Sequence, residues 1–325
     1  MKILLVQTSH PGDIVLSLPV ISFLKEEKHP CTLDLLTTKE GEELLKWDPR
    51  INTIITYDKH NKEKSLKDLL KLSALLKKNN YTAAYSLHRS YRTALLLFFA
   101  DIQERIGFKN SAFSFLYTKK VARLPFLPDI FRNLLIATDN FKKIANTEAK
   151  LYLKDAKNSD PSVQQYLNEK NLALIFPGSK WATKQWTLEG FAKTANWLKA
   201  QAGLKVVVAG GANEKSLCQA VAKKSRTECL ANNVALDDLA LLVSKAKLVV
   251  CNDSLPLHLA SALKVPVVGI YCSTVPEFGF VPLNSPAVLV RKTGLYCQPC
   301  GRHGFKKCPI NTHNCANLLS AKEVI

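Results

Sequence analysis

The stretch that decides the fold is Ile175-Phe176-Pro177-Gly178-Ser179-Lys180-Trp181-Ala182-Thr183-Lys184-Gln185-Trp186. It joins an apolar strand, predicted over 172–176, to an amphipathic helix that begins near Thr187. The loop between them carries two hydroxyls and two lysines, and the N–H groups of the helix start face the same spot, which suits a phosphate or diphosphate. The spacing is neither G-x-x-x-x-G-K-[ST] nor G-x-G-x-x-G, so it predicts neither a P-loop nor a dinucleotide fingerprint. An ordinary turn between strand and helix is the alternative interpretation.

Strands and helices alternate on both sides of this loop. In the first half we expect strands at 3–7, 31–37, 51–57 and 81–87, with helices at 14–27, 38–45, 66–78 and 93–100. A polar segment without periodicity, 154–162, is the candidate linker, with a short helix that opens at Pro161 as the alternative for its end. Beyond it we expect strands at 172–176, 205–209, 248–251 and 267–271, with helices at 188–201, 214–225, 236–245 and 257–263. This pattern predicts an α/β protein with two Rossmann-like, doubly wound domains, and ligands bind such sheets beyond the carboxyl ends of the strands.

Length and charge limit the class of protein. The chain has 325 residues, enough for two domains, and a formal net charge of +18. That charge favours anionic partners, which are nucleic acid, an anionic membrane surface or phosphorylated substrates, although a generally lysine-rich surface is the alternative. Nucleic acid is not favoured, because the chain has no RNP-type aromatic motif and no zinc-finger spacing. No apolar run reaches about 18 residues, and the apolar start at 1–6 is too short for a signal peptide, so it is predicted to be the first strand.

Three further polar clusters follow predicted strands. Asp13 ends the cluster Thr8-Ser9-His10-Pro11-Gly12-Asp13, where it is either an N-cap or a general base that takes a proton from an incoming hydroxyl. Glu214 closes Gly210-Gly211-Ala212-Asn213-Glu214 and can hold a ribose diol, or it complements the helix dipole. The third cluster is Asn252-Asp253-Ser254-Leu255-Pro256-Leu257-His258, which opens a helix and forms a second candidate anion site. Ser254 and Asp253 can also cap that helix, and a structural role is the alternative for His258.

Together these clusters resemble glycosyltransferase family 9, the bacterial ADP-heptose:lipopolysaccharide heptosyltransferases. The resemblance covers essentially the whole chain. It rests on S-x-x-G-D, P-G-S-x-W-x-T-K-x-W, G-G-x-x-E and N-D-S-x-x-x-H in this order, and on Arg105-Ile106-Gly107-Phe108, Ser273-Thr274-Val275-Pro276 and Gly279-Phe280-Val281-Pro282. It implies a GT-B fold, with an N-terminal Rossmann-like acceptor domain at 1–155 facing, across a cleft, a C-terminal nucleotide-sugar donor domain at 163–325 that carries a cysteine-rich tail.

The resemblance also implies roles for individual residues. Asp13 matches the catalytic base of an inverting single displacement, and no metal is required for catalysis. The donor-binding positions that it implies are Ser179, Thr183 and Lys184 at the diphosphate, Glu214 at the adenosine ribose, Asp253 at a sugar hydroxyl, Ser254 beside it, and His258 near a phosphate. One departure is Leu255, where the family often has glycine. The backbone N–H survives that change, but a close approach of the backbone to the donor is put in doubt.

The resemblance therefore predicts a cytoplasmic enzyme, peripheral on the cytoplasmic face of the inner membrane. It would move a heptose from ADP-heptose to the inner core of lipopolysaccharide, and it is closer to heptosyltransferase II. The expected partners are the ADP-sugar donor, a lipid A–Kdo type glycolipid acceptor and the anionic membrane surface, without nucleic acid. The alternatives are a GT-B transferase with another nucleotide-sugar donor, and a catalytically silent nucleotide-sugar-binding protein.

Two basic loops are predicted to bind the acceptor. One follows the third expected strand and the other the fourth, so both should lie at carboxyl ends near Asp13. The acceptor-binding residues that we expect are Ser9, Lys62, Lys64, Arg89 and Arg92. Lysine and arginine suit the carboxylates and phosphates of such an acceptor. Ordinary solvated lysines and a packing role for Arg92 are the alternatives.

Nine cysteines are spread unevenly along the chain. The odd count and the size predict a reducing cytoplasm, with five buried free thiols at Cys31, Cys218, Cys229, Cys251 and Cys272. The tail has the spacing Cys297-x2-Cys300-x7-Cys308-x6-Cys315. Structural zinc, reduced thiols and disulfides are all open there, and zinc is not favoured over reduced thiols. None of these alternatives makes the tail catalytic.

Overall fold

A computed structural model describes residues 1–58, 65–231 and 234–325 of the protein. The chain divides into two compact units, Met1–Tyr152 (unit 1) and Leu153–Ile325 (unit 2). Within the described ranges, no helix combines the length and apolar character that are needed to cross a membrane.

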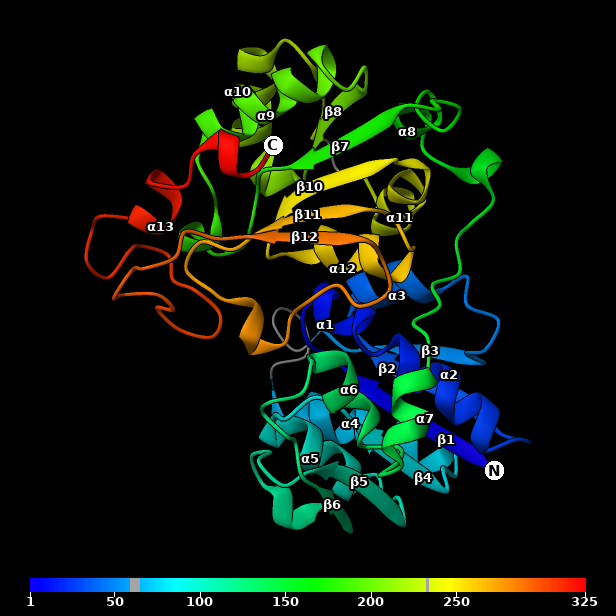
Figure 1. Ribbon diagram of the computed structural model, residues 1–325. Coiled ribbons are helices and arrows are strands. Elements are labelled where there is room, and N and C mark those ends of the chain that lie inside the picture. Colours follow the sequence, from blue (N-terminus) through cyan, green and yellow to red (C-terminus); the bar gives the residue numbers. More distant parts are fainter. Residues whose placement is uncertain (59–64, 232–233) are drawn as a thin grey trace. The chain divides into compact units, whose positions relative to one another are not determined.

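Unit 1 is built on a six-stranded sheet with the order β3-β2-β1-β4-β5-β6, in which all neighbouring strands are parallel (Figure 1). Its strands are β1 (Lys2–Gln7), β2 (Thr32–Thr37), β3 (Thr53–Thr56), β4 (Ala83–Ser86), β5 (Glu104–Phe108) and β6 (Lys119–Val121). Its helices are α1 (Pro11–Val15), α2 (Leu18–Glu27), α3 (Lys39–Leu45), α4 (Leu66–Lys78), α5 (Tyr91–Phe99), α6 (Asp129–Leu134) and α7 (Phe141–Asn146), with the 3-10 turn η1 (Ser114–Leu116).

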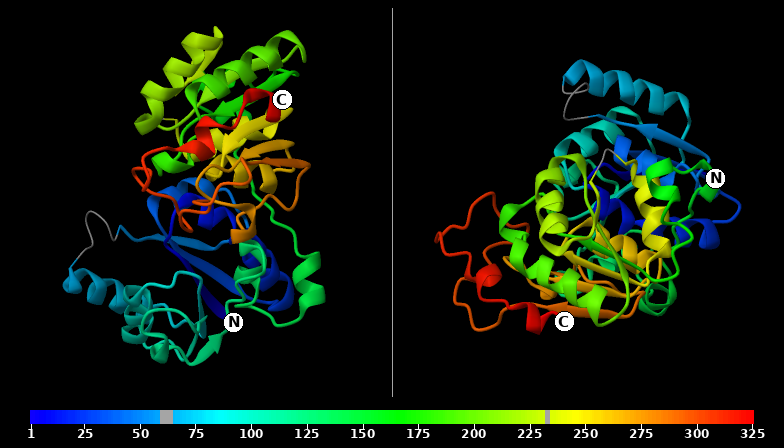
Figure 2. Two further views of the ribbon diagram at one scale, coloured as in Figure 1. Left: turned by 60° about the vertical axis from the view of Figure 1, so that its left-hand side comes forward. Right: turned by 90° about the horizontal axis from the view of Figure 1, so that it is seen from above.

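Unit 2 repeats the same topology with a sheet ordered β12-β11-β10-β7-β8-β9, again parallel throughout. Its strands are β7 (Leu172–Phe176), β8 (Lys205–Ala209), β9 (Glu228–Leu230), β10 (Leu248–Asn252), β11 (Val267–Ile270) and β12 (Ala287–Val290). Its helices are α8 (Pro161–Gln164), α9 (Leu188–Ala200), α10 (Lys215–Ser225), α11 (Leu236–Lys245), α12 (Leu255–Ala262) and α13 (Asn314–Asn317), with the 3-10 turns η2 (Ala156–Asn158), η3 (Ala182–Lys184), η4 (Ala212–Glu214), η5 (Pro276–Phe278) and η6 (Ala321–Glu323). Helices α9 and α10 pack side by side, as both further views show (Figure 2).

The burial of the central strands explains why the sequence forms parallel sheets that are covered on both faces. Every residue of β7 is buried, and so are residues 3–7 of β1. Continuous apolar runs of this kind are typical of parallel strands that are covered on both faces. In each unit the strand order reverses next to the first strand, between β1 and β4 and between β7 and β10. Loops that leave the carboxyl ends at such a switch point form the ligand-binding edge of a doubly wound sheet.

The predicted helix at 14–27 is in fact two helices, α1 and α2. Pro19 lies in the first turn of α2, where its missing N–H costs nothing, so a new helix starts just before it. The Ser17 hydroxyl donates to the carbonyl of Ile14 at 2.6 Å across the break. Four strands were not predicted from the sequence. Three of them, β6, β9 and β12, are short edge strands with few buried residues, and the fourth, β5, is an inner strand whose last three residues are buried.

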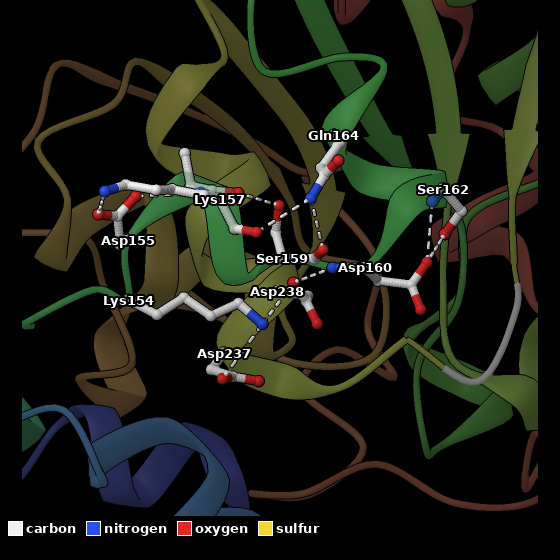
Figure 3. A network of polar contacts seen from close by, with 10 residues as sticks. Lys154, Asp155, Lys157, Ser159, Asp160, Ser162, Gln164, Asp237 and Asp238 are labelled. Atoms are coloured by element: carbon white, nitrogen blue, oxygen red, sulfur yellow. Dashed lines mark hydrogen bonds and ion pairs between the residues drawn. The ribbon is translucent and has the colours of Figure 1, made fainter.

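The segment 154–162 is more ordered than a linker, because it forms η2 and the start of α8. Lys154 points at the first turn of α11, where its ammonium lies 2.6 Å from Asp238 and 3.4 Å from Asp237 (Figure 3). The backbone N–H of Asp160 also donates to Asp238 at 2.9 Å. These contacts attach the segment to unit 2, which starts at residue 153.

Candidate functional site

Asp13 lies just beyond the carboxyl end of β1, in the first turn of α1. The N-cap of α1 is His10, so the interpretation of Asp13 as the capping residue is wrong. The carboxylate instead accepts a hydrogen bond from the backbone N–H of His10. A helix N-terminus close to the switch point of the sheet therefore holds this carboxylate.

Burial raises the pKa of Asp13 to about 6, and the negative charge of Asp129 adds to the rise. Arg123 and Arg89 act in the opposite direction. Asp129 is itself buried and is ion-paired with Arg123 and with Arg132, the latter at 3.1 Å. A carboxyl whose pKa is this close to neutrality is a stronger base than an ordinary aspartate, and it is still ionised at pH 7.

The positive charge of Arg89 acts on Asp13, as expected for a loop near that residue, and the contact of Arg89 with an acceptor stays a prediction. Arg92 is different, because its guanidinium donates to the Tyr57 hydroxyl at 2.8 and 3.1 Å, a contact that supports the packing alternative. Ser9 is half-buried, and its backbone N–H donates to the side chain of Gln7. Lys62 and Lys64 lie outside the described residues.

In unit 2, the predicted diphosphate loop is held by Asn252, for which the sequence analysis proposed no role. The Asn252 amide donates to the carbonyls of Pro177 and Gly178 at 2.8 and 3.2 Å, and it accepts from the Trp186 N–H at 2.9 Å. Asn252 is fully buried at the end of β10, which neighbours β7. The side chain thus fixes both ends of the loop. The sequence did contain a signal for this role, because Asn252 is a polar residue directly after a predicted strand and is the first residue of the N-D-S-x-x-x-H motif.

Lys184 and Asp253 form a buried ion pair. The Lys184 ammonium lies 2.6 Å from the Asp253 carboxylate and 3.2 Å from its carbonyl oxygen. The Thr274 hydroxyl donates to the same carboxylate oxygen at 2.8 Å. Two residues that were predicted to contact different parts of the donor therefore contact one another, and the carboxylate compensates the charge of the lysine.

Glu214 ends η4, the turn that follows β8, and its carboxyl group lies beside Gly178 in the predicted diphosphate loop. Its carboxylate accepts from the Gly211 N–H at 3.1 Å. A methyl group on Gly178 would come within 2.1–2.5 Å of this carboxyl group, so a larger residue there would displace the Glu214 side chain from the loop. Burial raises the pKa of Glu214. The P-G-S and G-G-x-x-E motifs thus meet at neighbouring carboxyl ends.

Thr183 is bound to the cysteine-rich tail. Its hydroxyl accepts from the Phe305 N–H at 2.8 Å and lies 3.2 Å from the Phe305 carbonyl, and the His313 ring contacts the Thr183 carbonyl at 3.1 Å. Gly304, at φ +79°, allows the close approach, because a Cβ there would lie 3.0 Å from the Thr183 hydroxyl. Ser179 is buried, and its carbonyl accepts from Gln185 at 2.9 Å. The tail therefore supports the diphosphate loop, a role that the sequence analysis missed.

The N-D-S-x-x-x-H motif opens α12. Ser254 is the N-cap residue, but its hydroxyl donates to the Asn252 carbonyl at 3.3 Å and does not cap the helix. His258 is buried one turn further along, 6.4 Å from the ring of Phe280 in an edge-on arrangement. The Arg302 guanidinium lies 5.6 Å from the same ring. Backbone N–H groups at the start of α12 face the carboxyl edge of the sheet, which is a favourable place for an anion.

Residues 69–309 match the sequence model of Glycosyltransferase family 9 (heptosyltransferase). The chain belongs to this family. The predicted glycosyltransferase activity is thereby confirmed. The relatives include the lipopolysaccharide heptosyltransferase 2 of Escherichia coli K12, which is 27% identical over an alignment of 310 positions; the alignment covers 90% of this chain and 88% of the relative. Another is the lipopolysaccharide core heptosyltransferase OpsX of Haemophilus influenzae, 27% identical over 82% of this chain and 78% of the relative.

Solved structures confirm the predicted GT-B fold. The E. coli ADP-heptose lps heptosyltransferase II superimposes with a TM-score of 0.79 at 21% identity, and the match covers 100% of this chain and 96% of the other. A glycosyl transferase family 9 protein from Veillonella parvula gives a TM-score of 0.76 at 19% identity, over 89% of this chain and 85% of the other.

None of the four cysteines in the tail of this family member is paired in a disulfide in the structure. Burial raises the pKa of Cys300, and negative charge at Cys297 and Cys308 adds to the effect. Burial also acts to raise the pKa of Cys308, but hydrogen bonds from the backbone N–H groups of residues 310–313 outweigh it. The pKa of the Cys308 thiol is therefore lowered. Across the described ranges, no group of three or more His, Cys, Asp or Glu side chains has an arrangement that could hold a metal ion. Structural zinc and reduced thiols both stay predictions.

Proposed function

We propose that this protein transfers a heptose from ADP-heptose to the inner core of lipopolysaccharide, with inversion and with Asp13 as the general base. The names of the curated relatives support the substrates. The observation that carries the proposal is the Asp13 carboxyl, which is held in the first turn of α1 with a pKa raised by burial to about 6. Such a group is ionised at neutral pH and can accept a proton.

The reaction is a single displacement. The Asp13 carboxylate takes the proton of an acceptor hydroxyl while the hydroxyl oxygen forms a bond to the anomeric carbon of the heptose. The bond from this carbon to the ADP oxygen breaks at the same time, and ADP leaves with the electron pair. The negative charge that develops on the leaving diphosphate needs positive charge and N–H donors. Lys184 and the N-termini of α9 and α12 would supply them, so the proposed catalysis requires no metal.

The Lys184–Asp253 ion pair implies that the donor competes with a carboxylate of the protein. Asp253 neutralises Lys184 before the donor binds, at an ammonium–carboxylate distance of 2.6 Å. A diphosphate that approaches Lys184 would compete with Asp253 for the ammonium. The carboxylate would then be available to accept a hydrogen bond from a sugar hydroxyl. Glu214, beside Gly178, would hold the ribose diol, and His258 and Ser254 would complete the phosphate side.

The acceptor would be a glycolipid of the lipid A–Kdo type, whose carboxylates and phosphates suit arginine and lysine. Arg89 supports this assignment, because its charge already acts on Asp13. We place the protein in the cytoplasm, peripheral on the inner membrane. A net charge of +18 favours attraction to that anionic surface.

Calorimetry with ADP-, UDP- and GDP-sugars tests the donor, and mass spectrometry of a deacylated core acceptor tests the transfer. We expect binding of ADP-heptose and the addition of one heptose. If a UDP- or GDP-sugar binds more tightly than ADP-heptose, the assignment of the donor is wrong, although the assignment of the fold stands. Tight ADP-heptose binding without transfer to any core acceptor would make the protein a silent nucleotide-sugar binder and would overturn the proposal.

A further inference from the structure

Helix α5 presents an apolar side to solvent. Tyr91, Phe98 and Phe99 lie on it at helical positions i, i+7 and i+8, and each of these side chains is between 42% and 48% exposed. Phe113 and Phe115, in the η1 segment, extend this surface and are 45% and 70% exposed. The ring centroid of Phe113 lies 5.8 Å from that of Tyr91 and 5.6 Å from that of Phe115, with the rings tilted in both pairs. We call these five side chains the aromatic face. Phe98 and Phe99 contact each other on the same helix, which packs against η1. Exposed aromatic rings gathered in this way on one helix and the adjoining turn are typical of an interaction site.

The surroundings of the aromatic face are basic. Residues 65–121 contain ten lysines and arginines against three carboxylates, which are Asp68, Asp101 and Glu104. The Arg105 guanidinium lies 5.7 Å from the Phe98 ring. Exposed Lys119 and Lys120 lie on β6, next to β5, and α4 packs against α5 with lysines on its exposed side. Helix α5 and strands β5 and β6 gather at one end of the unit 1 sheet (Figure 1).

This combination selects one kind of partner. Aromatic rings favour the boundary between hydrocarbon and water, and nearby lysines are attracted to anionic headgroups while their alkyl stems stay apolar. Protein–protein interfaces are depleted in lysine, so a lysine-rimmed aromatic surface fits a lipid surface better than another protein.

We propose that the aromatic face docks unit 1 on an anionic phospholipid bilayer. Its position suits a membrane-anchored acceptor, the one respect in which the inference rests on the proposed function. Tyr91 begins α5 directly after Arg89 and Ser90 at the carboxyl end of β4. The Ala112 N–H donates to the Arg89 carbonyl at 3.1 Å and joins the Phe113 segment to the same loop. The aromatic face thus borders the loop whose Arg89 acts on Asp13.

The test uses the full chain and vesicles of phosphatidylglycerol and phosphatidylethanolamine that contain neither donor nor acceptor. The double variant Phe99→Ser/Phe115→Ser should bind these vesicles at least roughly tenfold more weakly in flotation, because buried ring area is lost. The variant Phe141→Ser is the matched control, since it removes another exposed ring beside two lysines in unit 1, on α7. It should bind like the wild type. Lys119→Gln/Lys120→Gln should weaken binding several-fold, and only at low salt.

Transfer to a deacylated acceptor is measured in parallel and should not change in the double variant, which also shows that the variant is folded. Vesicle binding that is equal in the double variant and the wild type would overturn the docking surface. Wild-type protein that binds no vesicles, but changes from dimer to monomer in the double variant, would make the surface a self-association site and also overturn the proposal. Vesicle binding without any transfer would instead refute the proposed function and leave the docking surface in place.

Discussion

At the scale of single residues, Asp13 gives the sharpest expectation. Its raised pKa means that activity should fall as the pH drops through about 6, because the protonated carboxyl cannot accept a proton. Asp13→Asn should lower kcat by roughly a hundredfold or more and should remove this acidic limb of the pH profile. ADP affinity should stay unchanged. Steady-state kinetics between pH 5 and 8, with calorimetry for ADP, would check this; normal turnover in the variant would exclude Asp13 as the base.

Thermal stability provides the control for Asp13→Asn. The folded state holds the Asp13 proton more tightly than the unfolded chain, since the pKa rises from 3.8 to about 6 on folding. The associated stability is present below the unfolded pKa and is lost as the pH rises through about 6. At pH 7 the ionised carboxylate therefore costs stability, and the asparagine variant should melt at a higher temperature than the wild type. A lower melting temperature would mean that its inactivity reflects damage to the fold.

The Lys184–Asp253 pair predicts opposite effects for its two members. Lys184→Ala should weaken ADP binding about tenfold or more, because a hydrogen bond to a charged group contributes about 1.5–3 kcal/mol. Asp253→Asn should instead strengthen the binding of ADP, since the ammonium would no longer be neutralised by a carboxylate at 2.6 Å. It should lower turnover with the complete donor. Calorimetry measures the ADP affinity of both variants. Weaker ADP binding in Asp253→Asn would contradict the idea that Asp253 and the diphosphate compete for Lys184.

The sequence indicated most residues of the candidate site but not the contacts between them. Motif spacing selected Lys184 and Asp253, yet 69 positions separate them, so only the adjacency of β7 and β10 could reveal the ion pair. Asn252 was visible as a polar residue after a strand. Its role could be seen only from the structure, because the amide binds two carbonyls and one N–H of the loop that follows β7.

At the scale of elements, most strands could be predicted, including the edge strand β3, but the edge strands β6, β9 and β12 and the inner strand β5 were missed. Buried strands such as β1 and β7 are continuous apolar runs. Edge strands such as β6 and β12 are short and partly exposed, so their composition resembles that of loops. The segment 154–162 read as a linker for the same reason. Its order comes from an ion pair with α11, a partner that is more than 80 residues away in the sequence.

That ion pair predicts a stability change at the start of unit 2. Lys154→Met would leave Asp237 and Asp238 buried without their ammonium partner (Figure 3). Breaking a buried pair from one side costs about 3–5 kcal/mol. Lys157→Met is the matched control, because the Lys157–Asp155 pair is exposed and should contribute less than about 1 kcal/mol. Urea unfolding of the full chain measures both, and equal midpoints for the two variants would refute a structural role for Lys154.

At the scale of the whole molecule, the repeated topology and the charge have separate consequences. The two sheets share one strand order; the alternation of elements predicted two doubly wound parallel sheets but not the order of their strands. The net charge of +18 does not determine the fold, but it acts on association with anions. Exposed charges are screened beyond about 10 Å at 0.1 M salt, whereas buried groups such as Asp13 and Lys184 are screened much less. Added salt should therefore slow the association of the protein with an anionic acceptor and leave the rate of the chemical step almost unchanged.

We expect kcat/KM for an acceptor carried on anionic vesicles to fall steeply as salt rises, while kcat at saturation changes little. For a deacylated acceptor in solution the fall should be smaller, because fewer exposed cations face one small anion than face a charged surface. Arg89→Gln should raise the KM of both acceptors and leave ADP binding intact, since it acts beside Asp13 and not on the donor loop. Kinetics at several salt concentrations, with both acceptors, test the expectation. Equal salt dependence for the vesicle-bound and the soluble acceptor would show that the surface charge of the protein does not guide it to the membrane, even if Arg89 binds the acceptor.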